Sequence, residues 1–204
     1  QVLAVVRVAH AKGWHSIAFA QILQFELTLR QKDVIGEWVP VSEPGVSDVI
    51  DPVTNKKWMR GLHWKEIDDN LVLKHVTSKR QKEIEIDLHN APMVMEEMRW
   101  IGGPLTDGPL VVSEEHERAY YGHEFRYKWR QCAKAAGVPG FVVPTAGNAG
   151  AALAAYGAAA GLPVRVYAPE TTPPGILSTI RALGADLVTV AGHIGDAAAR
   201  AREF

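Results

Sequence analysis

The chain has 204 residues, of which 47% are hydrophobic and 22% charged. This composition is too apolar for a disordered chain, and the length suits one ordinary domain or two small ones. The formal net charge of −1 excludes a global positive field that would attract nucleic acid or a membrane surface, so any contact with DNA must be local.

The chain begins with a helical pattern followed by a loop. Residues 15–29 are dense in Ile, Ala, Phe and Leu, which predicts a largely buried helix, and Ser16 stands where an N-cap is expected. Residues 39–57 carry several Pro, Gly and Asn residues, which predicts a loop or insertion with turns.

A hairpin and two helices complete the first part of the chain. Residues 71–76 form one strand pattern, and residues 84–88 alternate apolar and acidic side chains with the period of two that a half-buried strand requires. The basic run 79–82 is then the hairpin tip. Residues 91–101 and 123–136 predict helices. The first part is therefore expected to be α+β.

The amino-acid composition of the chain changes abruptly over residues 135–141, which we call the seam. All six tryptophans lie at or before Trp129, and no lysine follows Lys134. A single domain seldom changes composition so abruptly. The sequence therefore predicts two domains, residues 1–137 and residues 138–204.

The second part alternates strands with helices, which predicts an α/β fold with a parallel three-stranded sheet. Gly161 and Gly184 stand where helix C-caps belong. The expected strands are 141–143, 164–168 and 186–190, and the expected helices are 151–160, 174–183 and a last one from Asp196.

A loop rich in small residues, 144–150, connects the first of these strands to the first helix. Free backbone N–H groups and the helix dipole favour negative charge at such a place. The loop is thus a candidate anion site, although turn geometry accounts for its glycines equally well and helix capping for Asn148.

The remaining features concern disulfides, metal sites and the cellular location of the protein. The one cysteine, Cys132, excludes an internal disulfide and is expected to be a buried structural thiol. We find no metal-binding group of Cys and His, no run of eighteen apolar residues and no signal-peptide pattern. We expect a cytoplasmic chain, truncated at both ends, with no membrane partner.

The first part resembles the catalytic domain of tyrosine recombinases, the phage integrases. The resemblance rests on Arg30-Gln31-Lys32-Asp33 after an apolar helix, on Trp64-Lys65-Glu66-Ile67-Asp68, and on the lysine-tipped hairpin that follows. It covers about two thirds of the chain, with these elements in the order of the family.

The recombinase resemblance implies a phosphate site. It gives Arg30 the role of gripping the scissile phosphate, Asp33 that of supporting the fold around it, and Lys79 that of general acid. A guanidinium offers paired donors to a phosphate, and a nearby lysine can give a proton to the leaving oxygen. The alternative interpretation of Lys79 is that it lies in a solvent-exposed turn and has no catalytic role.

The family also requires a second arginine box and a tyrosine nucleophile. His123 and Arg126 have the spacing of that box, but they lie in the helix that resembles the one preceding it, and we assign them no role. Tyr120, Tyr121 and Tyr127 also come before the expected place of the nucleophile. We therefore expect weak, sequence-indifferent DNA binding without strand transfer.

The second part resembles threonine synthase and the wider group of fold-type-II enzymes that use pyridoxal phosphate. The resemblance rests on the run 144–156, on Tyr167-Ala168-Pro169 and on residues 181–186. It implies that Thr145, Ala146 and Asn148 hold the carboxylate of an amino-acid substrate.

The same resemblance places Gly147 and the Asn148 side chain against the cofactor. It also places the lysine that bonds the cofactor before this loop, where the chain has recombinase-like sequence, and the phosphate cradle after Phe204. Lys128 and Lys134 match neither the context nor the role of the family lysine. Pyridoxal phosphate is thus implied but expected not to bind.

We predict a non-catalytic fusion of a truncated recombinase with a truncated threonine synthase. Two alternatives are a residual DNA-binding integrase fragment and a fragment of a pyridoxal-phosphate-dependent amino-acid lyase, threonine synthase. The sequence leaves open the DNA site, the amino-acid substrate, the oligomeric state and the origin of the fusion.

Overall fold

The computed structural model describes residues 2–137 and 139–203. It divides into two compact units, Gln1–Ala136 and Gly137–Phe204. The boundary falls inside the seam at residues 135–141. No helix in the described part of the chain is long and apolar enough to cross a membrane.

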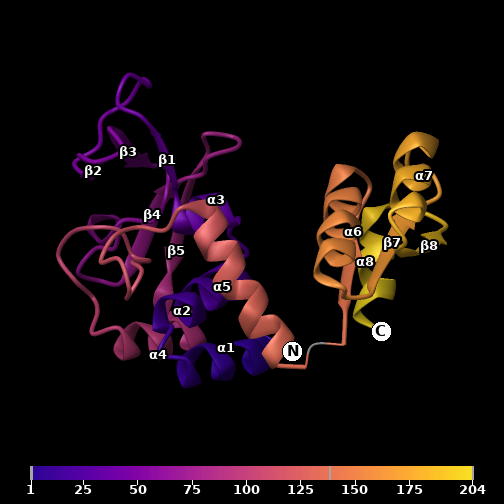
Figure 1. The fold of residues 1–204 in the computed structure, drawn as a ribbon, viewed down its shortest axis with the longest axis horizontal. Helices are drawn as coiled ribbons and strands as arrows, with labels where there is room; N and C mark the ends of the chain where they lie inside the picture. The colour runs from indigo at the N-terminus through magenta and orange to yellow at the C-terminus, as the bar shows by residue number, and fades with distance from the viewer. Residues whose placement is uncertain (1, 138, 204) are drawn as a thin grey trace. The chain divides into compact units, whose positions relative to one another are not determined.

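The first unit is built around a buried helix, α2 (His15–Glu26). Ile17, Phe19, Ile22 and Leu23 on this helix are at most 1% exposed. The helices α1, α3, α4 and α5 all contact it, and this unit is on the left of Figure 1. The helices of the unit besides α2 are α1 (Val2–Ala11), α3 (Gln31–Ile35), α4 (Pro92–Trp100) and α5 (Gly122–Ala135), with short 3-10 turns η1 (Trp64–Glu66) and η2 (Leu88–Asn90).

The start of α2 corrects one prediction. Trp14, not Ser16, occupies the N-cap position, and Ser16 lies inside the helix. The Ser16 hydroxyl donates to Glu114 Oε2 at 2.8 Å, and its backbone N–H donates to Glu114 Oε1 at 2.5 Å. A carboxylate from a distant segment therefore satisfies this helix end, which the local sequence does not reveal. Helix α1 was not predicted either.

The predicted loop at residues 39–57 is wrong in part, because it contributes to an antiparallel sheet. The strand order is β1 (Glu37–Pro40), β3 (Lys56–Met59), β2 (Ile50–Asp51). The strands are too short for a pattern of alternation to show in the sequence. Trp58 anchors the sheet, since its side chain is buried and its indole N–H donates to Ile35 O at 2.8 Å.

The predicted hairpin is confirmed. Strand β4 (Val72–Val76) pairs antiparallel with β5 (Glu83–Asp87). Leu73 and His75 point to the buried face of β4, whereas Lys79 at the tip is exposed. Helices with antiparallel sheets thus form the first unit, as expected.

The second unit is the predicted α/β arrangement, shown on the right of Figure 1. Its sheet is parallel in the order β6-β7-β8. Gly161 is the C-cap of α6 with φ of 65°, as predicted. The C-cap of α7 is Leu183, and Gly184 follows it with φ of 80°, one position later than predicted. The elements are β6 (Phe141–Pro144), α6 (Asn148–Ala160), β7 (Val164–Pro169), α7 (Pro174–Ala182), β8 (Asp186–Val190) and α8 (Ile194–Arg202).

Helices cover both faces of this sheet. Val164 and Val166 of β7 pack with Ile180 of α7 and with apolar residues of α6 on one face. Tyr167 points to the opposite face and is only 6% exposed. Helix α8, whose Ala197 is fully buried, packs against β6 and β7 and covers that second face.

Candidate ligand-binding loop

The loop at residues 145–147 lies at the carboxyl end of β6. Helices α6 and α7 lie on one face of the parallel sheet, and α8 returns across the other face toward β6. The connecting helices therefore change from one face of the sheet to the other beside β6, which makes this edge a topological switch point. In open α/β sheets, ligands bind at the carboxyl ends of the strands where such a switch occurs.

Thr145 holds the loop in shape. Its side chain is buried, and its backbone N–H donates to Tyr167 O at 2.9 Å. Its hydroxyl donates to Gly147 O and accepts from Gly147 N–H, both at 3.1 Å. The single hydroxyl hydrogen is thus used within the loop. A role in binding a carboxylate would require that hydrogen bond to be given up.

The beginning of α6 is open. Gly147 occupies the N-cap position in an extended conformation, with no side chain to cap the helix. A Cβ atom at Gly147 would meet nothing within 4 Å. Asn148 is the first residue of α6 rather than its cap, and both Asn148 and Ala146 are exposed. The first N–H groups of the helix are therefore accessible to an anion.

Gly150 has a different function. A Cβ atom there would collide with Thr145 Cγ2 and lie 3.1 Å from both Ile180 Cδ1 and Val166 Cγ1. Gly150 therefore allows α6 to approach the sheet closely. Gly150 is therefore needed for the packing of α6 against the sheet, whereas the free space at Gly147 lets a ligand reach the start of α6.

The donor groups of this loop fit only some contacts of pyridoxal phosphate, the cofactor that the resemblance implies. A hydroxyl, an amide side chain and helix N–H groups suit a carboxylate or a ring hydroxyl. A covalent bond to the cofactor needs a primary amine, and no lysine follows Lys134. The second unit by itself therefore does not fit covalent attachment of the cofactor.

Lys128 of α5 belongs to the first unit. Its side chain is 9% exposed, and its ammonium lies 3.2 Å from Glu115 Oε2. The same ammonium lies over the rings of Trp14 and Tyr120, at 5.2 and 5.7 Å from their centres. These contacts hold the amine as a structural cation within the first unit.

The residues of the predicted phosphate site come from two segments that one carboxylate connects. Asp33 is 1% exposed, and its Oδ1 accepts from the backbone N–H of Ser78 at 2.6 Å. Its Oδ2 lies 3.9 Å from the guanidinium of Arg30, which is half exposed. Ser78 adjoins Lys79, so Asp33 joins the start of α3 to the tip of the hairpin.

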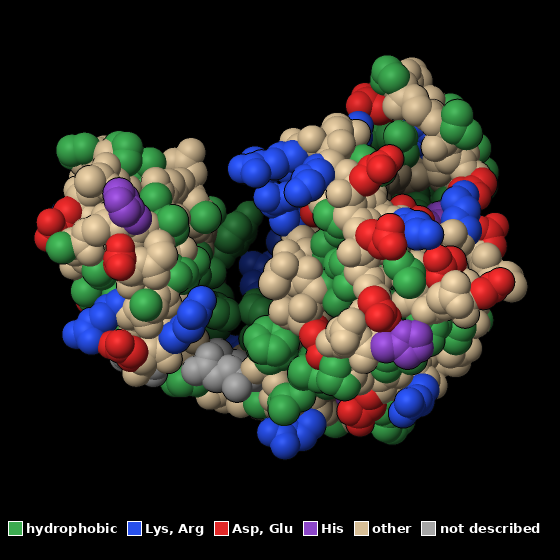
Figure 2. All heavy atoms as spheres, turned by 180° about the vertical axis from the view of Figure 1, so that it is seen from behind, with side chains coloured by type: hydrophobic (Ala, Val, Ile, Leu, Met, Phe, Trp, Pro, Cys, Tyr) green, Lys and Arg blue, Asp and Glu red, His purple; other side chains and the backbone are tan. Residues whose placement is uncertain are grey.

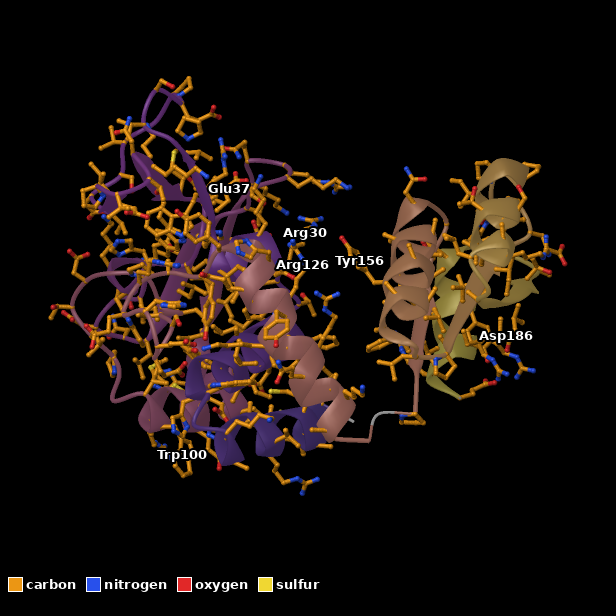
Figure 3. All side chains as sticks on the ribbon, in the orientation of Figure 1. Arg30, Glu37, Trp100, Arg126, Tyr156 and Asp186 are labelled. Atoms are coloured by element: carbon orange, nitrogen blue, oxygen red, sulfur yellow. The ribbon has the colours of Figure 1, made fainter. Side chains whose placement is uncertain are left out.

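Arg126 lies near the segment that follows Arg30. Arg126 lines a hollow of about 310 Å³ together with Gln31, the residue after Arg30. Figure 3 shows the side chains of Arg30 and Arg126 on the same side of the first unit. Figure 2 shows Lys and Arg side chains gathered on the surface of this unit.

Two buried histidines were missed by the sequence prediction. His63 and His75 line a hollow of about 610 Å³ in the first unit. His75 Nδ1 lies 3.0 Å from Glu66 Oε1, and its Nε2 lies 3.9 Å from Asp33 Oδ1. The signal for His75 was available, because it occupies the same face of its strand as Leu73.

Comparisons with known proteins concern the end of the chain. Residues 125–204 match the family model described as pyridoxal-phosphate dependent enzyme. The match begins within α5, before the boundary between the units. No curated protein matches the chain. Nothing in these comparisons supports the predicted recombinase in the first unit.

One solved structure, a crystal structure of a pyridoxal 5'-phosphate-dependent aspartate racemase, is similar to part of the chain at 25% identity. The similarity covers 36% of this chain and 23% of that one, with a TM-score of 0.34. That TM-score is too low to establish a shared fold. The family-model match therefore identifies residues 125–204 as part of a pyridoxal-phosphate-dependent enzyme domain.

Proposed function

We propose that the second unit contributes the carboxylate-binding loop of a pyridoxal-phosphate-dependent enzyme that acts on an amino acid. The observation that carries the proposal is the uncapped start of α6 beside the carboxyl end of β6. Both the family match and the threonine synthase resemblance favour a ligand at this loop. Threonine synthase remains the finer form of the proposal.

In the proposed site, each residue of the loop has a different role. The Thr145 hydroxyl positions Gly147, and the missing side chain at Gly147 leaves room for the ligand. Backbone N–H groups at the start of α6 donate to the carboxylate, with the helix dipole adding a favourable field. The exposed Asn148 amide is free to turn toward a bound ring hydroxyl. Pyridoxal phosphate, when bound, would supply the electron sink for chemistry at the amino acid.

The loop alone gives weak affinity. Each neutral hydrogen bond contributes about 0.5–1.5 kcal/mol, which must offset the cost of immobilising the ligand. Without an amine in the second unit, we propose that the chain by itself binds carboxylates reversibly and forms no covalent cofactor adduct.

The test is a titration of the full chain, labelled with ¹⁵N, by acetate and separately by pyridoxal phosphate. The expected result is a saturable shift of the Asn148 and Ala149 amide signals. Gly147→Ala should weaken this response because a methyl group then partly covers the amides. Gly175→Ala is the matched control, since a Cβ atom at Gly175 near the start of α7 also meets nothing within 4 Å.

Two outcomes would contradict the proposal. One is the absence of any shift at the start of α6 with either ligand. The other is an equal loss in both glycine variants. A pyridoxyl group fixed to Lys128 or Lys134 by borohydride, detected by mass spectrometry, would instead overturn the statement that the chain forms no covalent adduct.

A second candidate function is phosphodiester binding by the first unit. The specific observation in its favour is that Asp33 ties the segment of Arg30 to the segment of Lys79. Fixed cations that come together from two elements can contact one phosphate group. This candidate rests on the recombinase resemblance and on this geometry.

A further inference from the structure

His63 is a buried histidine whose ring has no hydrogen-bond partner. Its side chain is 8% exposed, and neither ring nitrogen makes a hydrogen bond among the described residues. Burying a polar group without a partner is costly. The ring nitrogens of this buried imidazole are therefore available to a ligand that enters the hollow lined by His63.

Two carboxylates lie close to this ring. Asp48 Oδ1 lies 3.6 Å from His63 Nε2, and Asp107 Oδ1 lies 3.3 Å from Nδ1. One ligand atom from each of the three residues lies within 4.8 Å of the other two. Asp48 and Asp107 are about half and two thirds exposed, so the group is open to solvent on one side.

The three residues come from three segments whose backbones are fixed to one another. Trp64 N–H donates to Gly108 O at 2.8 Å, which holds Asp107 beside His63. Ser47 Oγ donates to Trp58 O at 2.5 Å, which holds the loop of Asp48 against β3. The ring of His63 is therefore presented to both carboxylates by structure that exists without a ligand.

We propose that His63, Asp48 and Asp107 bind a divalent transition metal ion of the Zn²⁺ type. One imidazole and two carboxylates are ligands that such ions accept, at bond lengths of about 2.0–2.2 Å. Ligand atoms at these bond lengths stand about 3.3–3.6 Å apart in a tetrahedron. Because one ion takes only one of the two ring nitrogens, the exposed aspartate that lies nearer the other nitrogen has to move toward the ion to complete the set. Three protein ligands then leave a fourth position for water.

Lys65 is the group that competes with a metal ion here. Its ammonium lies 3.0 Å from Asp48 Oδ2. The other oxygen of this carboxylate, Oδ1, is the one that lies near His63. Removing the Lys65 charge should strengthen metal binding.

The experiment is calorimetric titration of the chelator-treated full chain with Zn²⁺, followed by Co²⁺ for its visible absorption. We expect one equivalent to bind. Asp107→Asn should weaken binding by about tenfold or more, because even the loss of a group that only supports a metal ligand costs about that much. Lys65→Met should tighten it. Asp69→Asn, at an exposed acid of the same unit, should leave it unchanged.

Because Asp107 is exposed, its variant tests the site without disturbing the core. A rise in melting temperature with Zn²⁺ that Asp107→Asn abolishes would support the proposal independently. Absence of binding would overturn it. Binding that survives Asp107→Asn and is lost in His15→Gln would also overturn it, because the ion would then sit at the contact of His10 and His15.

Discussion

The carboxylate of Asp33 accepts a hydrogen bond of 2.6 Å from the backbone N–H of Ser78, which ties the start of α3 to the tip of the β4–β5 hairpin. The two residues lie far apart in the sequence. Asp33 is almost fully buried, so this bond is not replaced by water when it is removed. It fixes where the hairpin tip lies relative to Arg30.

We predict that Asp33→Ala lowers the free energy of unfolding by about 1–3 kcal/mol, since the Ser78 N–H loses its partner. Tryptophan fluorescence during urea unfolding is the measurement. It reports on the first unit because all six tryptophans precede residue 130. Asp69→Ala, an exposed carboxylate, is the control and should change little. Equal effects of the two substitutions would refute the role of Asp33.

For DNA we predict weak, salt-sensitive binding without sequence preference. The net charge of −1 leaves only the local patch of Lys74, Lys79, Arg80 and Lys82 to displace counterions from phosphates. Lys79→Ala should reduce both the affinity and its salt dependence in a fluorescence anisotropy titration. Arg200→Ala is the control, because it removes one positive charge from α8 of the second unit, outside this patch. Salt-independent binding would contradict this prediction.

The two glycines of the α6 loop should respond differently to the same change. Gly150→Ala should destabilise the second unit by about 1–3 kcal/mol, because the added methyl group collides with Thr145 and crowds Ile180. Gly147→Ala should cost little, since its Cβ atom has free space. Amide hydrogen exchange at Val166 measures both. Similar exchange rates in the two variants would show that α6 does not pack closely against the sheet at Gly150.

Glu124 should make a pH-dependent contribution to stability. The Arg118 guanidinium bonds both oxygens of this carboxylate at 2.8 and 3.0 Å, and it lowers the pKa of Glu124 below its ordinary value of 4.5. A lowered pKa in the folded state gives stability that is complete above the unfolded value and is lost as the pH falls through the folded value.

Glu124→Gln should therefore cost about 1 kcal/mol at pH 7, a modest amount because the pair is partly solvated. The difference from the unsubstituted chain should shrink as the pH falls below about 4.5. Urea unfolding at several pH values is the measurement, with the exposed Glu96→Gln as control. A difference that grows toward acid would have the wrong sign.

Cys132 should be unreactive in the folded chain. The thiol is fully buried in α5, and burial raises its pKa, so little reactive thiolate is present. Ellman's reagent should label it only after denaturation, and Cys132→Ser should remove the denatured-state signal. Rapid labelling without denaturant would show that α5 opens locally.

Much of the second unit followed from the sequence alone. The strands and helices alternate along the chain, and each buries one face, so the period of apolar residues near Val164 and Ile180 reveals both kinds of element. The β4–β5 hairpin was predictable for the same reason. The change of composition near residue 137 likewise marked where one compact unit ends and the next begins.

The candidate sites depended on tertiary structure. The pairing of β1 with β3, the carboxylate of Glu114 at the start of α2, and the position of Asp107 beside His63 all join segments that are distant in sequence. Local patterns record which face of an element is buried, but they do not record which partner buries it. That partner is decided when the chain packs, because hydrogen bonds and close contacts then form between groups with no local signal.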